Sequence, residues 1–189
     1  MMELLRIEAP LTPETARALR AGQRVLLSGV VYTARDAAHR RLCELLDEGG
    51  EPPVPLAGAV IYYCGPAPAP PGRPIGSAGP TSSYRMDPYV PRPLEAGMLG
   101  VIGKGPRSEA VRAALMARGG VYFAATGGAG ALLARCVESA ELVAYPELGP
   151  EALRRLVVRE LPLVVALDSA GGDLYVEGPA AYLAALGEK

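Results

Sequence analysis

The sequence has very few of the residues that usually bind metal ions. It contains one histidine, His39, and three cysteines, Cys43, Cys64 and Cys136, which are far apart along the chain. No Cys-x-x-Cys pair and no Cys/His ligand spacing is present, which argues against a self-contained zinc site or iron–sulfur cluster. We therefore expect three buried free thiols in a reducing compartment and no metal bound by this chain alone.

Long apolar runs and blocks of like charge are also absent. The longest apolar candidate, Leu161–Leu167, has the length of a strand and contains Pro162, so it does not indicate a membrane span. The formal net charge is −1, with no basic block that would indicate a nucleic-acid partner. Residues Met1–Glu8 lack the charged and then apolar layout of a signal peptide. We expect a cytoplasmic protein that binds neither nucleic acid nor a membrane.

Lysine is nearly absent, whereas apolar residues are plentiful. The chain has two lysines and 17 arginines, and Lys104 is the only lysine that is not the last residue. With 189 residues, of which 50% are hydrophobic and 21% charged, the chain is long enough for one well-packed domain, which we place at residues 1–189. Glycine and proline are concentrated in residues 49–106, so the centre of the chain is expected to be rich in turns.

Apolar β-branched runs alternate with helical patterns along the chain. Expected strands are 3–8, 24–32, 58–64, 99–103, 121–126, 141–145, 156–159 and 163–168. Expected helices begin at residues 12, 33, 104 and 127, and a last helix covers 179–186. This alternation predicts an α/β domain, and the turn signal Gly171-Gly172-Asp173 suggests a late hairpin that makes the sheet mixed.

The stretch Gly76–Tyr89 combines a tight turn with hydroxyl side chains and an arginine. Three hydroxyl residues follow Gly79-Pro80 at a possible helix start, where free backbone N–H groups attract anions. Arg85 lies four residues after Thr81, one helical turn away, so both side chains can face one ligand. A guanidinium, a hydroxyl and free amides suit a carboxylate. Taken alone, however, the stretch is better explained as a capped helix with a surface arginine.

Two further cations stand near strand-to-helix junctions, where open α/β sheets place ligand groups. Arg35 follows the strand 24–32, and Lys104 lies between two glycines after the strand 99–103. Together with Arg85 they would suit a small dianion such as a dicarboxylate, if the sheet brings them together. His39, one helical turn after Arg35, is better interpreted as a residue that packs or hydrogen-bonds locally than as a catalytic one.

Several motifs together resemble one family. They are Ser-Gly-Val-Val-Tyr-Thr-Ala-Arg-Asp-Ala-Ala-His (28–39), Tyr-Tyr-Cys-Gly-Pro-Ala-Pro (62–68), Gly-Ser-Ala-Gly-Pro-Thr-Ser-Ser-Tyr-Arg-Met-Asp-Pro-Tyr (76–89), Ile-Gly-Lys-Gly (102–105), Tyr-Phe-Ala-Ala-Thr-Gly-Gly-Ala (122–129) and Val-Ala-Leu-Asp-Ser (165–169). In these motifs the chain resembles the β subunit, or C-terminal domain, of class I fumarate hydratase. The β subunit of L-tartrate dehydratase belongs to the same superfamily.

The resemblance implies a fold, a reaction and a partner. The fold would be a swivelling β/β/α domain with a mixed sheet flanked by helices. The reaction would be the reversible hydration of fumarate to (S)-malate. The resemblance also implies that a 4Fe-4S cluster belongs to a separate α subunit, where its open iron would act as a Lewis acid, and that the two subunits form a heterotetramer.

The resemblance also assigns roles to individual residues. Arg35, Arg85 and Lys104 match positions that hold the substrate carboxylates. Thr81 matches the threonine proposed as the catalytic base toward the C3 proton, and Ser82 stands beside it where the family usually has a second threonine. A threonine hydroxyl is a poor base unless its anion is stabilised, which the nearby cations and free amides would favour.

Two acids, Asp36 and Asp87, each lie near an arginine and are expected to orient it rather than to act as acids. Two other functions stay open at this point. A tartrate dehydratase β subunit would share the fold and the cationic site. A non-catalytic carboxylate-binding or assembly subunit is a different class, which a neighbouring gene for an iron–sulfur α subunit would argue against.

Overall fold

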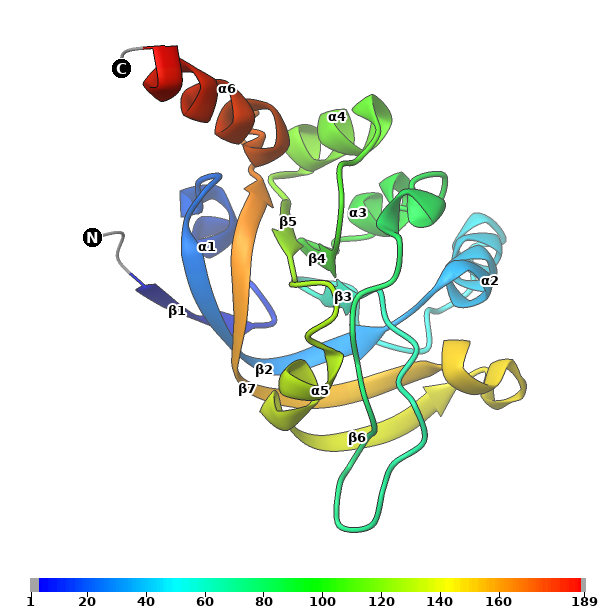
Figure 1. Cartoon of the computed structure of the whole chain (residues 1–189). Helices are drawn as coiled ribbons and strands as arrows, with labels where there is room; N and C mark the ends of the chain where they lie inside the picture. Colours follow the sequence, from blue (N-terminus) through cyan, green and yellow to red (C-terminus); the bar gives the residue numbers. More distant parts are fainter. Residues whose placement is uncertain (1–3, 188–189) are drawn as a thin grey trace.

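The computed structural model describes residues 4–187, which form seven strands and six α-helices (Figure 1). The strands are β1 (Leu4–Ala9), β2 (Arg24–Thr33), β3 (Val60–Tyr62), β4 (Gly100–Gly103), β5 (Val121–Ala124), β6 (Val137–Ala144) and β7 (Leu153–Leu167). The helices are α1 (Pro13–Ala18), α2 (Asp36–Asp47), α3 (Pro91–Glu95), α4 (Glu109–Arg118), α5 (Gly130–Leu133) and α6 (Leu174–Gly187). Three 3-10 helices complete the list: η1 (Ser83–Met86), η2 (Ala134–Cys136) and η3 (Pro146–Glu151).

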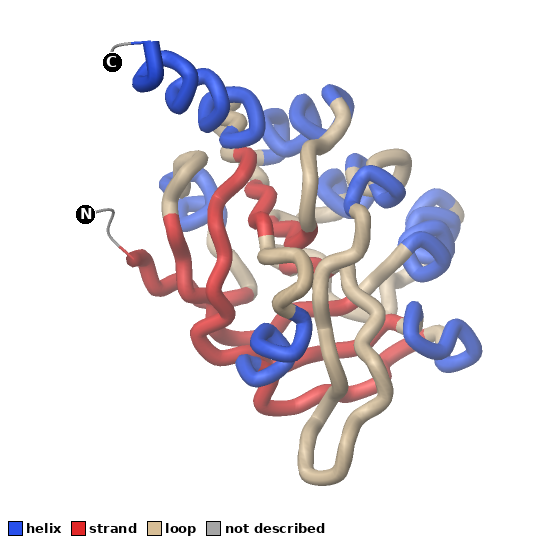
Figure 2. The backbone as a smooth tube through the Cα atoms, viewed as in Figure 1, coloured by secondary structure: helices blue, strands red, loops and turns tan. Residues whose placement is uncertain are grey.

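The sheet closes on itself. Its order is β1-β2-β3-β4-β5-β7-β6, and β7 also pairs with β2, so that β2, β3, β4, β5 and β7 form a ring of five strands. Strands β1 to β5 pair in parallel, whereas β7 runs antiparallel to β2, β5 and β6. The predicted mixed sheet flanked by helices is confirmed (Figure 2). The closure into a ring was not foreseen, and the swivelling of the domain stays a prediction.

Strand alternation divides the core into two layers. Along β3, the side chains of Val60 and Tyr62 pack into one buried cluster and that of Ile61 into the other. The same alternation separates Tyr122 from Phe123 on β5, because successive strand residues point to opposite faces. The second cluster includes the buried apolar side chains of α2, α3 and α4. These helices therefore cover one face of the sheet and hold its strands in place.

Several predicted boundaries were wrong. The expected strands 156–159 and 163–168 are one strand, β7, which continues through Glu160, a residue with a φ of 48°, and Pro162. Pro162 lies opposite Leu26 of β2, so the pairing with β2 continues through the proline. The turn at 171–173 is present with a single antiparallel bridge between Leu167 and Asp173, but it leads into a helix instead of a strand.

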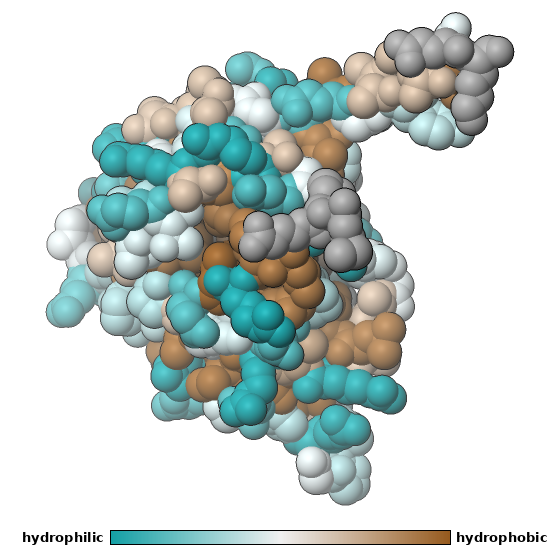
Figure 3. All heavy atoms as spheres, turned by 90° about the vertical axis from the view of Figure 1, so that its left-hand side faces the viewer, coloured by the Kyte–Doolittle hydropathy of each residue, from teal (hydrophilic) through white to brown (hydrophobic). Residues whose placement is uncertain are grey.

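Helix α6 differs from the other helices in its exposure. It starts five residues before the predicted residue 179 and continues through Pro179. It projects from the rest of the molecule, as Figure 3 shows, and none of its described side chains is buried. The exposed apolar side chains include Val176, Tyr182, Leu183 and Leu186. Among residues 4–187, no helix combines the length and the apolar character that crossing a membrane requires.

The single histidine packs and hydrogen-bonds locally, as the sequence predicted, and it lies in the core. His39 on α2 is fully buried, and its Nδ1 lies 2.9 Å from the carbonyl oxygen of Arg35. Its ring also packs edge-on against Tyr63, with 5.1 Å between ring centroids. Burial lowers the pKa of His39 to about 4. The imidazole is therefore neutral near pH 7, and its Nδ1–H donates to the Arg35 carbonyl.

This buried histidine should make stability depend on pH. The unfolded chain binds a proton on His39 below about pH 6.5, whereas the folded chain does not until about pH 4. The free energy of unfolding should therefore fall as the pH is lowered, by roughly 1–2 kcal/mol between pH 6.5 and 5. Urea unfolding at several pH values measures this slope. A His39→Gln variant should be less stable at pH 7 but nearly flat over the same window, and an equal slope in both proteins would contradict the assignment.

Candidate functional site

The parallel strands bring two of the three predicted cations to one edge of the sheet. Strands β2, β3, β4 and β5 run in the same direction, so their carboxyl ends lie side by side. Arg35 follows β2 and starts α2, and Lys104 directly follows β4. The backbone N–H of Ala34 donates to the carbonyl of Tyr62, which ties the end of β2 to the end of β3. Both residues predicted at strand-to-helix junctions therefore lie at the same edge, with the end of β3 between them.

A long loop brings the third segment to the same edge. Residues 65–80 leave the end of β3, extend far from the body and return beside it (Figure 1). Backbone bonds link Ala67 with Ser77 and Gly76, so the two arms of the loop are held together. The returning chain pairs with Tyr63, whose carbonyl accepts the Thr81 N–H at 2.8 Å, and Ser82 forms a parallel bridge with Lys104. The proline-rich loop thus delivers the hydroxyl residues to the strand ends.

The local structure of this segment differs from the prediction. No α-helix begins at Thr81 in the described chain; a 3-10 helix, η1, begins at Ser83, and Ser82 precedes it without a side-chain cap. Thr81 instead lies in extended chain that continues the sheet. The extended conformation is favoured over a helix because the Thr81 N–H and the Ser82 bridge complete the pairing with the neighbouring strands. The α-helical spacing of Thr81 and Arg85 was therefore wrong, although both residues stay near the edge.

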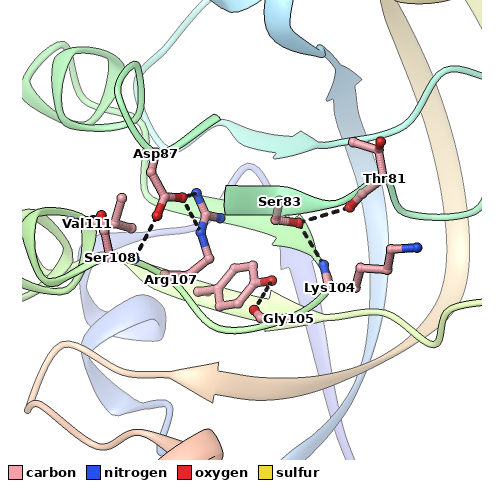
Figure 4. A network of polar contacts seen from close by, with 9 residues as sticks. Thr81, Ser83, Asp87, Lys104, Gly105, Arg107, Ser108 and Val111 are labelled. Carbon is pink, nitrogen blue, oxygen red and sulfur yellow. Dashed lines mark hydrogen bonds and ion pairs between the residues drawn. The ribbon is translucent and has the colours of Figure 1, made fainter. Parts of the chain in front are cut away.

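Thr81 and Lys104 are connected through one side chain (Figure 4). The hydroxyl of Ser83 accepts a hydrogen bond from the backbone N–H of Lys104 at 2.8 Å and donates one to the carbonyl of Thr81 at 3.2 Å. Beyond Lys104, Gly127 lies close to the lysine side chain: a Cβ at that glycine would be 3.5 Å from the lysine Cδ. Hence Thr81, Lys104 and the turn after β5 border the same region.

Arg35 is held by a carboxylate of its own chain. Its Nη2 lies 3.2 Å from Oε1 of Glu151, a residue of η3, and both side chains are about one quarter exposed. The other oxygen of Glu151 accepts the backbone N–H of Ala37 at 3.2 Å, at the start of α2. The Nε of Arg35 is buried without a hydrogen-bond partner. Glu151, which sequence reasoning missed, therefore fixes Arg35 and the first turn of α2 together.

Each of the two predicted acids binds an arginine, but only one of these is a predicted site residue. Asp36 accepts from Nε of Arg85 at 3.0 Å, which links η1 to the start of α2. Asp87 instead binds Arg107, with 2.7 Å from its Oδ1 to the arginine Nε, and also accepts the Ser108 N–H. The arginines near these acids in sequence are Arg35 for Asp36 and Arg85 for Asp87, so neither acid binds the arginine that was expected. The fold instead pairs Asp36 with Arg85 and Asp87 with Arg107.

Arg107 was missed by sequence reasoning altogether. Its side chain is completely buried, with the guanidinium 5.2 Å from the ring centre of Tyr63 and 4.9 Å from that of Tyr122. A buried arginine is stable only when it is paired, and Asp87 together with the two aromatic faces supplies this environment. Nothing in Gly-Pro-Arg-Ser marks this residue in the sequence, since its importance comes from the rings around it.

The charges around the edge are nearly balanced. Arg35 and Arg85 each have a carboxylate partner, whereas Lys104 has no ion pair with any described residue. Among the three predicted cations and the two carboxylates that bind them, one positive charge remains, that of Lys104. An anionic ligand would therefore meet an unpaired ammonium group and two arginines whose remaining N–H groups can be shared.

The cysteines of the chain do not form a site for an iron–sulfur cluster. Cys64 is buried, Cys43 and Cys136 are partly buried, and all three are free thiols. Within residues 4–187, no three His, Cys, Asp or Glu side chains are grouped so that they could hold a metal ion. Burial raises the pKa of Cys43 to about 11 and also raises that of Cys64, which disfavours the thiolate that binds metals. These residues do not fit a cluster.

Comparison with known proteins gives a consistent result. The family described as Fumarase C-terminus matches residues 2–178. The chain is 41% identical over 154 residues to the anaerobic class I fumarate hydratase of Escherichia coli K12, covering 80% of this chain and 28% of that protein. It is 37% identical over 177 residues to a putative class I fumarate hydratase of Geobacillus stearothermophilus, covering 91% of this chain and 34% of that protein.

A second kind of relative has a similar length to this chain. The putative L(+)-tartrate dehydratase subunit beta of Methanocaldococcus jannaschii is 36% identical over 177 residues, which cover 88% of this chain and 89% of that protein. By contrast, the chain spans only about a third or less of the fumarate hydratases it matches. The match over nearly all of its residues shows that this chain belongs to the Fumarase C-terminus family.

Proposed function

We propose that this chain is the β subunit of an iron–sulfur hydro-lyase that interconverts fumarate and (S)-malate. The observation that carries the proposal is the gathering of Arg35, Thr81 and Lys104 at the carboxyl ends of neighbouring parallel strands, in a chain of this family. The chain would form one fumarase-type domain, residues 1–189, in a cytoplasmic enzyme. Its partner would be an α subunit, in a heterotetramer.

The cations would bind the two carboxylates of the substrate. Lys104 has no ion pair within the described chain, so it can contact a carboxylate without breaking an existing bond. Arg35 and Arg85 each use some of their N–H groups on Glu151 and Asp36, and a planar guanidinium has further N–H groups for a second carboxylate. Asp36 and Glu151 would thus orient the two arginines before the substrate arrives, which reduces the entropy lost on binding.

Thr81 would take the proton from C3 of malate, and Ser82 would hydrogen-bond the substrate beside it. The backbone of Thr81 is fixed by Tyr63 and Ser83, which gives this segment a defined place next to Lys104. A nearby ammonium group stabilises a developing alkoxide and lowers the free energy needed to ionise the hydroxyl. Asp87 would contribute indirectly, because it holds Arg107 below the site.

The cofactor is proposed to lie outside this chain. The described cysteines do not fit a 4Fe-4S cluster, so we assign the cluster to the α subunit and derive no step of this chain's residues from it. The site residues are partly exposed at an edge of the domain: the side chains of Arg85 and Arg35 have exposed fractions of 43% and 24%. An α subunit docking against this edge would complete the site and exclude water from it.

One observation favours a second candidate, an L-tartrate dehydratase β subunit. The putative tartrate dehydratase subunit beta of Methanocaldococcus jannaschii corresponds to this chain over 89% of its own length, whereas the fumarate hydratases are much longer. Tartrate is also a dicarboxylate, so the three cations would serve both substrates. A non-catalytic assembly subunit is the remaining alternative, which the ordered contacts of Thr81 and Lys104 do not favour.

Reconstitution tests the function directly. The chain should be combined anaerobically with its candidate α subunit, iron and sulfide, and assayed with fumarate, (S)-malate and L-tartrate. We expect hydration of fumarate by the mixture, while the chain alone is inactive and shows no cluster absorbance. Turnover of tartrate in preference to fumarate would support the second candidate. Stoichiometric cluster incorporation by the isolated chain would contradict the assignment of the cofactor.

The proposed binding of the substrate carboxylates by Arg35 and Arg85, here called the arginine clamp, predicts that a positive charge alone at these positions does not sustain activity. Arg35→Lys and Arg85→Lys keep a positive charge but lose the planar fork that shares two carboxylates, so each should lower kcat/KM by about tenfold or more. Steady-state kinetics on the reconstituted enzyme measure the effect. Arg41→Lys is the matched control on α2, because Arg41 pairs with Glu147 and forms no ion pair with a site residue. If both clamp variants behave like this control, the clamp is wrong.

If Thr81 is the base, activity should depend on its hydroxyl group and not on the shape of its side chain. Thr81→Val removes the hydroxyl at nearly constant volume and should lower kcat by about a hundredfold, the scale of a positioned acid–base group. Thr81→Ser keeps the hydroxyl and should retain much of the rate. Thermal unfolding should show both variants folded. A Val variant with normal kcat would leave Thr81 a structural role and move the base to the α subunit.

A further inference from the structure

Ser83 joins the proposed base to the proposed carboxylate-binding lysine. Its hydroxyl accepts the Lys104 N–H at 2.8 Å and donates to the Thr81 carbonyl at 3.2 Å, so one oxygen contacts the backbones of both residues (Figure 4). The side chain is 1% exposed, which excludes water as an easy substitute. Sequence reasoning treated Ser83 only as one of three hydroxyl residues and gave it no role.

The packing around Ser83 leaves its hydroxyl little freedom to move. A Cβ added at Gly103, the last residue of β4, would collide with the Ser83 hydroxyl and approach its Cβ to 2.9 Å. The absence of a side chain at Gly103 therefore lets the serine approach the strand closely enough to bond the next residue, Lys104. Glycine at 103 and serine at 83 act as one unit that sets the distance between η1 and the end of β4.

Neighbouring contacts hold both sides of this unit. On the η1 side, Asp87 binds the buried Arg107 and the Ser108 N–H. On the strand side, the Gly105 N–H donates to the hydroxyl of Tyr175, and its carbonyl accepts from the hydroxyl of Tyr122. The backbone on either side of the Ser83 bonds is thus anchored, and these two bonds, together with the bridge between Ser82 and Lys104, set how Thr81 and Lys104 lie relative to each other.

We propose that Ser83 is a positioning residue that fixes the relative placement of Thr81 and Lys104 in the catalytic site. This inference rests on the proposed function, since it assigns the base to Thr81 and carboxylate binding to Lys104. Without the hydroxyl, the buried N–H of Lys104 and the carbonyl of Thr81 lose a partner, and the two segments shift to recover hydrogen bonds. A displacement of about 1 Å is enough to lower a rate about a hundredfold.

The test is Ser83→Ala in the reconstituted enzyme, with Ser108→Ala as the matched control. Ser108 is a hydroxyl in the same region whose oxygen accepts the Val111 N–H at the start of α4, without contact to Thr81 or Lys104 through its side chain. Both variants lose one hydroxyl and some stability. Ser83→Ala should lower kcat about tenfold or more and raise KM for the dicarboxylate several-fold, whereas Ser108→Ala should keep both values within about twofold.

Double variants distinguish positioning from a general loss of structure. In a Lys104→Ala background, Ser83→Ala should no longer raise KM, and in a Thr81→Val background it should no longer lower kcat, because the positioned group is already gone. Ser83→Cys, which retains a weak donor and acceptor, should recover part of the rate and replaces the alanine variant if that protein does not fold. Additive effects in both backgrounds, or normal kinetics for Ser83→Ala, would overturn the proposal.

The outcomes for Ser83 and for the overall function can be told apart. A wild-type complex with no activity on fumarate, malate or tartrate would refute the proposed function, whatever the variants do. An active wild-type complex whose Ser83→Ala form has normal kcat and KM, but a lowered melting temperature, would leave the function intact and make Ser83 purely structural. The proposal is supported if the wild-type complex is active, Ser83→Ala impairs both kcat and KM, and Ser108→Ala impairs neither of them.

Discussion

The pairing of β7 with both β2 and β5 is the constraint on which the rest of the structure depends. It closes five strands into a ring and so fixes the spacing of the four parallel strands between its ends. Because Arg35 and Lys104 follow two of these strands, and the chain at Thr81–Ser82 adds to the edge between them, the geometry of the site follows from the closure. Loops alone would not hold three separate segments at one edge with this precision.

Ionic contacts then fix what the sheet has brought together. Glu151 and Asp36 bind the two arginines of the edge, and Asp87 binds Arg107 beneath it. The first two pairs are partly exposed, so water and salt screen them and they contribute little to folding stability. Their value is geometric, because each orients a guanidinium. The Asp87–Arg107 pair is different: the arginine is fully buried, so loss of the acid would leave an uncompensated charge in the core.

Close backbone approach is the third element of the design. Gly103 permits the contact with Ser83, and Gly127 lies against the side chain of Lys104. Gly103 is the last residue of β4 and Gly127 lies in the turn after β5, where the chain passes from the sheet to the site. Small residues at these points bring backbone N–H groups and hydroxyls near a bound ligand, whereas side chains there would separate the segments. The domain thus combines a rigid sheet, oriented charges and narrow spacing at one edge.

The sequence by itself determined the alternating elements, the mixed sheet, the local packing of His39 on its helix and the arrival of Arg35 and Lys104 at strand ends. These features follow from local patterns of apolar residues and from the common direction of parallel strands. Only the tertiary structure decided that β7 closes a ring, that Thr81 continues a strand instead of starting a helix, and that Asp87 pairs with Arg107. It also placed Glu151 on Arg35 and Ser83 between Thr81 and Lys104. Some of these contacts join residues that are far apart in sequence. Others depend on which backbone N–H and C=O groups at the strand ends are still free to pair. A local sequence pattern encodes neither kind of contact.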